Sequence, residues 1–226
     1  MDQKIIFLHI PKTAGTSLRQ LIQNVYPGKQ CLPLYYPWPY QPAVIEEIKG
    51  QLPDTQILYG HTLFGIHELL NIQAQYVTFL RNPIDRVISF YNHNACHSNA
   101  EYYATIQRGV SLLKLLKGEN APQTNNLMTR MIAPYKPNDL LDDDRILEQA
   151  IDNIEKQFCF VGLVEKMAES VELLSKKLGW PSSYEIPYLN AVPSKQIDKV
   201  DAQTKAALEK YNRLDILLYQ HIQQQL

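Results

Sequence analysis

The sequence predicts a single α/β domain over residues 1–226, a three-layer sandwich around a mainly parallel central sheet. Short apolar runs typical of buried strands alternate along the chain with stretches of helical periodicity, the pattern of parallel sheets covered by helices. The chain has 226 residues, 45% of them hydrophobic, which suffices for one sizeable core and does not require two. In such folds ligands gather outside the carboxyl ends of the strands.

The first strand and helix flank a short polar loop. An apolar run at residues 5–8 predicts a buried strand that begins at about Lys4. Four apolar residues on one face at helical spacing predict the helix that follows: Leu18, Leu21, Ile22 and Val25. Between them, residues 9–17 read His-Ile-Pro-Lys-Thr-Ala-Gly-Thr-Ser. This arrangement places the loop at a helix N-terminus.

The loop has the composition of an anion site. Backbone N–H groups and the helix dipole favour an anion there, Gly15 allows close backbone approach, and Lys12 adds a mobile positive charge. Thr16 or Ser17 can cap the helix and donate to an oxyanion. An ordinary strand–helix turn is the alternative, but it needs five such residues to gather within six positions by chance. The predicted anion-binding residues are Lys12, Thr13, Ala14, Gly15, Thr16 and Ser17.

ATP is not the expected ligand of this loop. A Walker A sequence has a second glycine before its Lys-Ser/Thr pair, whereas here Lys12 precedes the single Gly15.

Prolines and aromatic residues dominate residues 27–42, and the prolines predict no regular structure there. The segment is either a packed surface loop or an aromatic platform for an acceptor. The elements predicted after it are a helix over 43–51, a strand over 56–59, a helix over 65–70 and a strand over 76–80.

The third strand leads into Arg81 and a helix that Asn82 caps, with Pro83 at its first position. Further helices are predicted over 101–118 and 122–132, and another after the aspartates at 142–144. A fourth strand over 158–163, a helix ending near Gly179, a loop with three prolines and a last helix over 201–224 complete the chain.

Lys12, His61 and Arg81 each follow a predicted strand, which is the main argument for an active site. Arg81 and Ser89, two helical turns apart, can hold one phosphate together. A lone histidine after a strand is usually structural, but beside an anion loop His61 is a candidate base because imidazole titrates near neutral pH. His93, Cys96 and His97 do not have the spacing of a standard zinc site.

Residues 9–17 resemble the 5′-phosphosulfate loop of sulfotransferases that use 3′-phosphoadenosine 5′-phosphosulfate (PAPS). Their sequence looks like that of the branch that includes heparan sulfate 2-O-sulfotransferase. Residues 77–91 resemble the 3′-phosphate motif of that family, with Arg81 and Ser89 at the matching spacing, and Arg86 is similar to a family arginine. Residues 59–61 resemble its His-Gly-His catalytic segment, with Tyr59 in place of the first histidine. With similar stretches at 160–165 and 214–219, the resemblance covers most of the chain.

The resemblance implies a P-loop-NTPase-like sulfotransferase fold and transfer of the sulfuryl group of PAPS to a hydroxyl of a carbohydrate or small molecule, without a metal. On this interpretation Lys12 stabilises the leaving phosphate and His61 takes the acceptor proton. Arg81 and Ser89 anchor the 3′-phosphate, and Lys195 is a further phosphate contact. The alternatives are a non-catalytic nucleotide- or glycan-binding module and an ATP-dependent small-molecule kinase.

Charge, cysteine spacing and hydropathy limit the possible binding partners and the cellular location. A net charge of −1 gives no basic field for nucleic acid. Cys31, Cys96 and Cys159 have no disulfide or metal spacing and are expected to be free thiols in the reducing cytoplasm. No apolar run approaches the ~20 residues that span a bilayer, and the early first strand leaves no room for an anchor. We therefore expect a soluble, bacterial-type relative; the sequence indicates neither the acceptor nor the oligomeric state.

Overall fold

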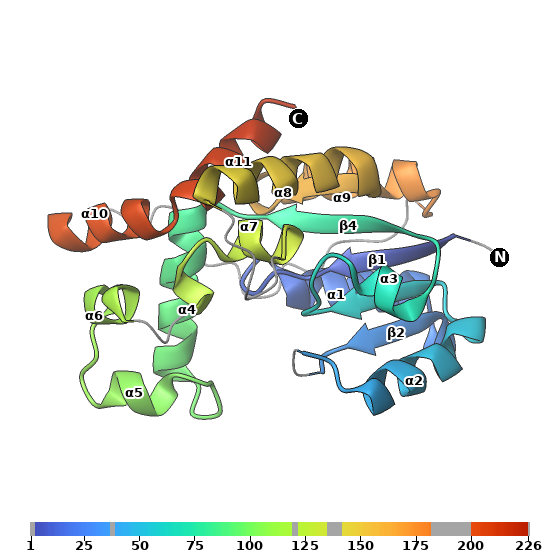
Figure 1. Ribbon diagram of the computed structural model, residues 1–226, viewed down its shortest axis with the longest axis horizontal. Helices are drawn as coiled ribbons and strands as arrows, with labels where there is room; N and C mark the ends of the chain where they lie inside the picture. The colour runs from blue at the N-terminus through green and yellow to red at the C-terminus, as the bar shows by residue number, and fades with distance from the viewer. Residues whose placement is uncertain (1–2, 37–38, 119–121, 135–141, 182–199, 226) are drawn as a thin grey trace.

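The fold is taken from a computed structural model, which describes residues 3–36, 39–118, 122–134, 142–181 and 200–225. Its centre is a five-stranded sheet in the order β2-β3-β1-β4-β5, in which every adjacent pair is parallel (Figure 1). The strands are β1 (Lys4–Leu8), β2 (Cys31–Leu34), β3 (Ile57–Gly60), β4 (Ala74–Leu80) and β5 (Phe158–Leu163). The predicted α/β class and parallel sheet are confirmed.

Helices cover both faces of this sheet, as the strand sequences require. Successive side chains of a strand point to opposite faces, so Ile6 and Leu8 enter one apolar cluster and Phe7 enters the other. The Phe7 face is covered by α1 (Gly15–Val25) and α9 (Met167–Leu178). Four helices contribute most to the opposite face: α3 (Ile66–Leu70), α7 (Leu127–Ile132), α8 (Asp143–Gln157) and α11 (Arg213–Gln223). The result is the predicted three-layer sandwich.

The three strands that precede the predicted site residues are neighbours at the centre of the sheet. Leu8 at the end of β1 is in register with Gly60 of β3 on one side and with Thr78 of β4 on the other. The ladder continues one step further, since the His9 amide donates to the Gly60 carbonyl at 2.9 Å. The segments that begin at His9, His61 and Arg81 therefore leave the sheet at one edge.

The prediction that residues 27–42 lack regular structure is wrong for Cys31–Leu34, which form β2. Leu32 and Leu34 are buried, and the strand pairs with β3 over its whole length. Proline is tolerated because β2 lies at the end of the sheet and has a partner on one side only, where the exposed Pro33 need not supply every ladder hydrogen bond. A short helix, α2 (Pro42–Gln51), follows as predicted.

Three of the predicted helices are interrupted. Residues 101–118 contain two short helices, α5 (Tyr103–Gln107) and α6 (Leu112–Lys117), separated by Gly109 at a φ of 86°. Within 122–132, a 3₁₀ turn over Pro122–Thr124 precedes α7. The last predicted helix is divided at the buried Asn212 into α10 (Ala202–Tyr211) and α11, because the Asn212 side chain donates to the carbonyls of Leu208 and Thr124.

The helix after β4 is predicted correctly. Helix α4 (Pro83–Cys96) begins after Asn82, whose side-chain oxygen accepts from the amides of Ile84 and Asp85. Its apolar face packs with α6 and α10 in a cluster beyond the carboxyl ends of the strands (Figure 1).

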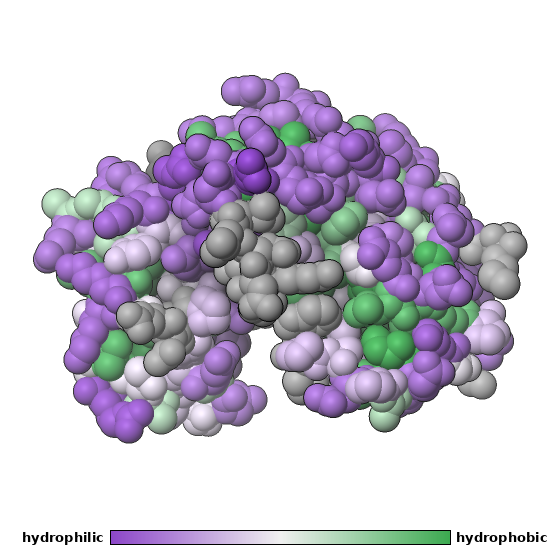
Figure 2. Space-filling model, in the orientation of Figure 1, coloured by the Kyte–Doolittle hydropathy of each residue, from purple (hydrophilic) through white to green (hydrophobic). Residues whose placement is uncertain are grey.

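The surface is hollowed between this helical part, with α5 and α6, and the part formed by α2 and β2 (Figure 2). The carboxyl ends of the strands point toward this hollow (Figure 1). None of the helices within the described ranges has both the length and the hydrophobicity needed to cross a bilayer.

Candidate functional site

The loop after β1 has an unusual backbone. Lys12 and Ala14 adopt left-handed conformations, with φ of 72° and 61°, and neither is glycine. Such conformations cost on the order of 1–3 kcal/mol each and tend to persist at ligand sites. Thr13 between them is buried, and both its amide and its hydroxyl donate to the Ile10 carbonyl, at 3.3 and 2.8 Å. Thr13 therefore shapes the loop, and its hydroxyl is directed into the loop backbone.

The start of α1 differs from the expectation that Thr16 or Ser17 caps it. The N-cap residue is Ala14, and no side chain caps this helix end. No acidic residue lies in the first turn either. Thr16 is exposed, whereas Ser17 is buried and faces the core. Since the first N–H groups of a helix have no intrahelical acceptor, this end keeps the hydrogen-bonding capacity and positive dipole that attract an anion.

Gly15 is needed for a reason that the sequence did not indicate. A Cβ atom built on Gly15 would overlap the Nε2, Cε1 and Cδ2 atoms of the His9 ring. The expected role, close backbone approach to an anion, is accompanied by a second requirement: the missing side chain makes room for an imidazole. Gly60 is required similarly, because a Cβ there would overlap the backbone of Leu34 on β2.

Two partly buried cations meet beside the loop. The Arg81 guanidinium donates from Nη1 to the Lys12 carbonyl at 3.2 Å. Burial, and secondarily the charge of Arg81, lowers the pKa of Lys12. Burial also lowers the pKa of Arg81, although Asp85 and Glu165 act in the opposite direction. Within the described part of the chain neither cation forms an ion pair, so bound anionic groups would relieve the repulsion between the two charges.

The turn that carries Arg81 is fixed by hydrogen bonds to residues distant in the sequence. Glu165 accepts from the Asn82 amide at 2.7 Å and from the Tyr219 hydroxyl at 2.8 Å. Ser89 lies two turns along α4 and is 5% exposed. Lys195, the further phosphate contact expected from the sequence, lies outside the described residues.

Arg86, in the first turn of α4, is entirely buried. Its Nη2 donates to the Gln123 carbonyl at 2.8 Å, while Nε and Nη1 have no hydrogen-bond acceptor among the described residues. Burial lowers the pKa of Arg86 to about 10, opposed by the charge of Asp215. Asp215 is also buried and accepts three hydrogen bonds, from the Met128 amide and from the amide and hydroxyl of Thr129. The hydrogen bonds of Asp215 thus tie α11 to α7, and that of Arg86 ties α4 to the turn before α7.

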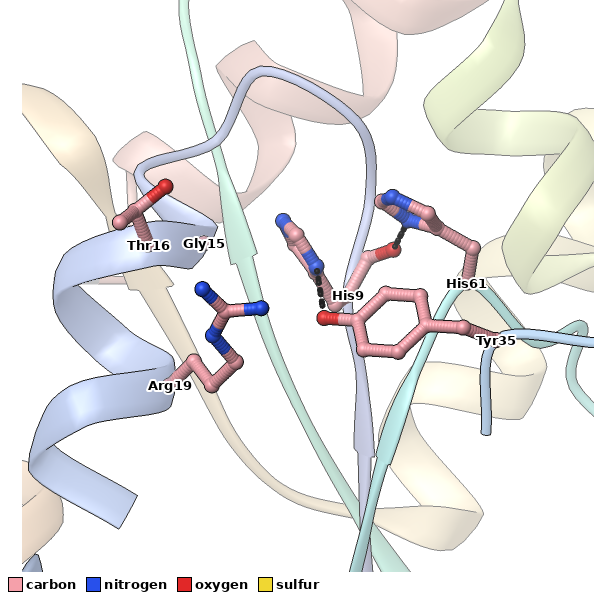
Figure 3. A pocket seen from close by; sticks show the side chains of 6 residues that line it. All are labelled: His9, Gly15, Thr16, Arg19, Tyr35 and His61. Carbon is pink, nitrogen blue, oxygen red and sulfur yellow. Dashed lines mark hydrogen bonds between the residues drawn. The ribbon is translucent and has the colours of Figure 1, made fainter. Parts of the chain in front are cut away.

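A pocket of about 240 Å³ is lined in part by residues of the loop (Figure 3). Its lining residues come from the ends of β1, β2 and β3 and from the start of α1: His9, Gly15, Thr16, Arg19, Tyr35 and His61. The His9 and His61 rings lie with centroids 4.4 Å apart, and the Tyr35 ring packs edge-on against His61 at 5.1 Å. The His9 Nδ1 and the Tyr35 hydroxyl are 3.2 Å apart.

The hydrogen bonds decide which histidine can act as a base. The Nδ1 atom of His61 lies 2.8 Å from the His9 carbonyl, which can only accept, so Nδ1 carries the proton and Nε2 keeps the lone pair. Burial lowers the pKa of His61 below its usual value of 6.5, partly offset by this hydrogen bond. Burial lowers the pKa of His9 much further, to about 3, with help from His61, Arg19 and Lys12. Both rings are neutral near pH 7, and His61 is the more basic.

Tyr59, which stands where the family segment has its first histidine, is not among the residues that line the pocket. Its side chain is buried, and its hydroxyl accepts from Gln23 at 3.1 Å. The second imidazole of the site comes from His9 instead. The sequence carried a signal for it, since His9 directly follows the first strand, but only the pairing of β1 with β3 places it beside His61.

Arg19 was not predicted as a site residue, and Tyr35 was predicted only as one of the aromatic residues of the segment 27–42. Arg19 reads as an ordinary exposed residue one turn after Gly15, and Tyr35 follows a strand that was not predicted. The predicted aromatic platform is represented in the pocket by Tyr35, while residues 37–38 of that segment lie outside the described residues. His93 and His97 stack on each other with centroids 4.1 Å apart, and no group of three metal-ligating side chains occurs among the described residues.

A family model described as galactose-3-O-sulfotransferase matches residues 2–226. Human galactose-3-O-sulfotransferase 2 is 22% identical over 241 residues; the match covers 96% of this chain and 58% of that protein, so the chain spans less than two thirds of this relative. The mouse sulfotransferase SULT7A1 complexed with PAP is 15% identical, with a TM-score of 0.47, over 93% of this chain and 66% of that one. A sulfotransferase from Alicyclobacillus acidocaldarius is 13% identical, with a TM-score of 0.49, over 94% and 96%.

The predicted resemblance to sulfotransferases is thus confirmed, whereas the narrower resemblance to the heparan sulfate 2-O-sulfotransferase branch stays a prediction. The family model extends over nearly the whole chain, including the loop at 9–17, His61 and the Arg81–Ser89 segment. This chain therefore belongs to the galactose-3-O-sulfotransferase family.

Proposed function

We propose that this chain transfers the sulfuryl group of PAPS to an acceptor hydroxyl on a carbohydrate. The observation that carries the proposal is the juxtaposition of two unlike sites at one sheet edge. Lys12 and Arg81 form a cationic site without an ion-pair partner among the described residues, and a pair of neutral imidazoles lies in the pocket that the same loop helps to line. Membership of the galactose-3-O-sulfotransferase family supports this assignment.

The donor binds along the loop and α4 in this proposal. Lys12 and the uncapped start of α1 hold the phosphosulfate end, where negative charge develops on the leaving phosphate. Arg81 and Ser89 hold the 3′-phosphate, with the planar guanidinium supplying paired donors. Tethering of Arg81 to the Lys12 carbonyl fixes the spacing between the two phosphate sites.

His61 is the proposed general base. As the bond between the acceptor oxygen and sulfur forms, the bond between sulfur and the leaving phosphate oxygen breaks, and the acceptor proton passes to Nε2 of His61. The His9 carbonyl holds His61 in the required tautomer, and the lowered pKa keeps it neutral at neutral pH. Transfer of this kind depends on in-line positioning and charge stabilisation more than on covalent catalysis.

The acceptor side has the chemistry of a sugar site. Tyr35 and the two imidazoles present flat apolar surfaces with hydrogen-bonding edges, which suit one face of a pyranose ring. A galactose hydroxyl is the first acceptor to test, because the family description and the human relative both name galactose.

We also propose that the protein works in the cytoplasm. The free cysteines Cys31, Cys96 and Cys159 support this location, because thiols stay reduced there.

The proposal is tested by binding and by transfer. Calorimetry should show that 3′-phosphoadenosine 5′-phosphate (PAP) binds more tightly than AMP, because losing the charge-assisted bonds to one phosphate costs on the order of 2 to 5 kcal/mol. Radiolabelled sulfate should then pass from PAPS to a galactoside. Equal affinity for PAP and AMP, or tight PAP binding without transfer to any saccharide in a mixed panel, contradicts the proposal; the second result indicates a non-catalytic binding module.

A further inference from the structure

Arg19 presents a cation to the pocket from α1. Gly15, Arg19 and Gln23 are spaced by four residues, so they lie on one face of the helix. This face is directed at the aromatic side of the site, because Gln23 donates to the Tyr59 hydroxyl at 3.1 Å. Figure 3 shows the Arg19 guanidinium reaching into the pocket toward His9 and the Tyr35 hydroxyl. The side chain is exposed, so a bound molecule can reach it.

No carboxylate of the described residues is paired with this charge. No carboxylate lines the pocket, and Arg19 forms no ion pair within the described ranges. The N–H groups of the Arg19 guanidinium are therefore available to donate hydrogen bonds to a molecule bound in the pocket.

Arg19 is separate from the cations of the donor site. Lys12 and Arg81 do not line the pocket, and Arg81 contacts the Lys12 carbonyl at 3.2 Å. Lys12 contributes to the lowered pKa of His9, but the charge of Arg19 acts on more groups of this part of the site. It adds to the burial that lowers the pKa of His9, and it opposes the burial that raises the pKa of Tyr35 and Tyr59. The site thus has a donor part with two cations and an acceptor part with one.

We propose that Arg19 binds an anionic group of the acceptor, so that the acceptor is an acidic saccharide whose carboxylate lies near the hydroxyl to be sulfated. This inference rests on the proposed function. The guanidinium fork matches a carboxylate in two parallel hydrogen bonds, which adds orientation to attraction. The pocket is smaller than the roughly 300–1,000 Å³ that encloses a drug-sized ligand, so it holds about one sugar ring beside the histidines.

The test uses two acceptors that differ in one group. Methyl galactoside and methyl galacturonoside have the same ring, but the second has a carboxylate in place of the hydroxymethyl group. Their affinities for the PAP-bound protein are measured by calorimetry or NMR titration. The parent should bind the galacturonoside at least about tenfold more tightly, the usual strength of a charge-assisted, bidentate contact.

Arg19→Gln should abolish this preference while leaving affinity for PAP and for the galactoside within about twofold of the parent. The matched control is Arg145→Gln, which makes the same change of charge at an exposed position on α8, outside the pocket. It should keep the parental preference.

Three results overturn the inference. They are equal or undetectable binding of the galacturonoside by the PAP-bound parent, a preference that survives in Arg19→Gln, and a tenfold loss of PAP affinity in that variant. The last would place Arg19 in the donor site.

Transfer of labelled sulfate, measured on the same samples, separates this inference from the proposed function. Equal sulfation of both glycosides refutes the role of Arg19 and leaves the proposed function standing. A galacturonoside that binds through Arg19 but is never sulfated, in a panel with no other product, refutes the proposed function and leaves the Arg19 site standing.

Discussion

Replacing Gly15 by alanine should disturb the pocket through a steric overlap with His9. The new Cβ would overlap three atoms of the imidazole, and even the farthest of them, Cδ2, would lie at 2.5 Å, where ordinary contacts are 3.4–4 Å. The ring is held by the stack on His61 and by the Tyr35 hydroxyl, so it must leave both to make room. Overpacking of this kind costs about 1–3 kcal/mol, while alanine is favoured over glycine in a helix by roughly 0.5–1 kcal/mol.

We therefore expect Gly15→Ala to lower the free energy of unfolding by about 1 kcal/mol in urea denaturation, the difference between the centres of these two ranges. Acceptor kcat/KM should fall by about tenfold to a hundredfold, since small misplacements in a site have effects of that size. Gly50→Ala is the control, because Gly50 lies in α2 and a Cβ there would have no neighbour within 4 Å. It should stabilise the protein by roughly 0.5–1 kcal/mol and leave transfer unchanged.

A double-mutant cycle isolates the overlap. In a His9→Ala background the alanine at position 15 has no ring to displace, so Gly15→Ala should be neutral or slightly stabilising there. The interaction energy between the two sites should lie in the range of about 0.5–3 kcal/mol found for contacting residues. If Gly15→Ala is as stable and active as the parent, or costs the same with and without the His9 ring, the steric argument is wrong.

Three further outcomes are expected. His61→Ala should reduce the rate of transfer by about 10²–10⁴-fold while keeping the affinity for PAP. Because the pKa of His61 is lowered below 6.5, the rate of the parent should fall only as the pH drops below that value. A folded His61→Ala variant with parental turnover would remove His61 from the mechanism. Arg81→Lys keeps the charge but loses the planar fork, so calorimetry should show weaker PAP binding, and parental affinity would refute the bidentate contact. Arg86→Met should lower unfolding stability by about 1–3 kcal/mol, because it removes the hydrogen bond to the Gln123 carbonyl and the positive charge that acts on the buried Asp215. Asp215→Asn should recover part of the loss, and fully additive effects of the two substitutions would argue against their electrostatic coupling.

Local patterns in the sequence determined most of the elements. The apolar run at 5–8 and the Asn-Pro-x-Asp pattern at 82–85 are local signals, and the structure has β1 and the capped start of α4 where they predict them. Strand β2 was not predicted, because proline argues against a strand unless the strand lies at the edge of its sheet. Whether Pro33 lies in an edge strand depends on the order of strands in the whole sheet. The division of the last helix at Asn212 depends similarly on Thr124, distant in the sequence.

Only part of the candidate site could be predicted from the sequence, and its arrangement could not. Lys12, His61 and Arg81 were predicted because each follows a strand, and parallel strands bring their carboxyl ends to one edge whatever their order. Strand order and register decided the rest: pairing of β1 with β3 stacks His9 on His61, and pairing of β2 with β3 brings Tyr35 to the same pocket. Such contacts join residues 26 and 52 positions apart, and no periodicity in a single chain reports them.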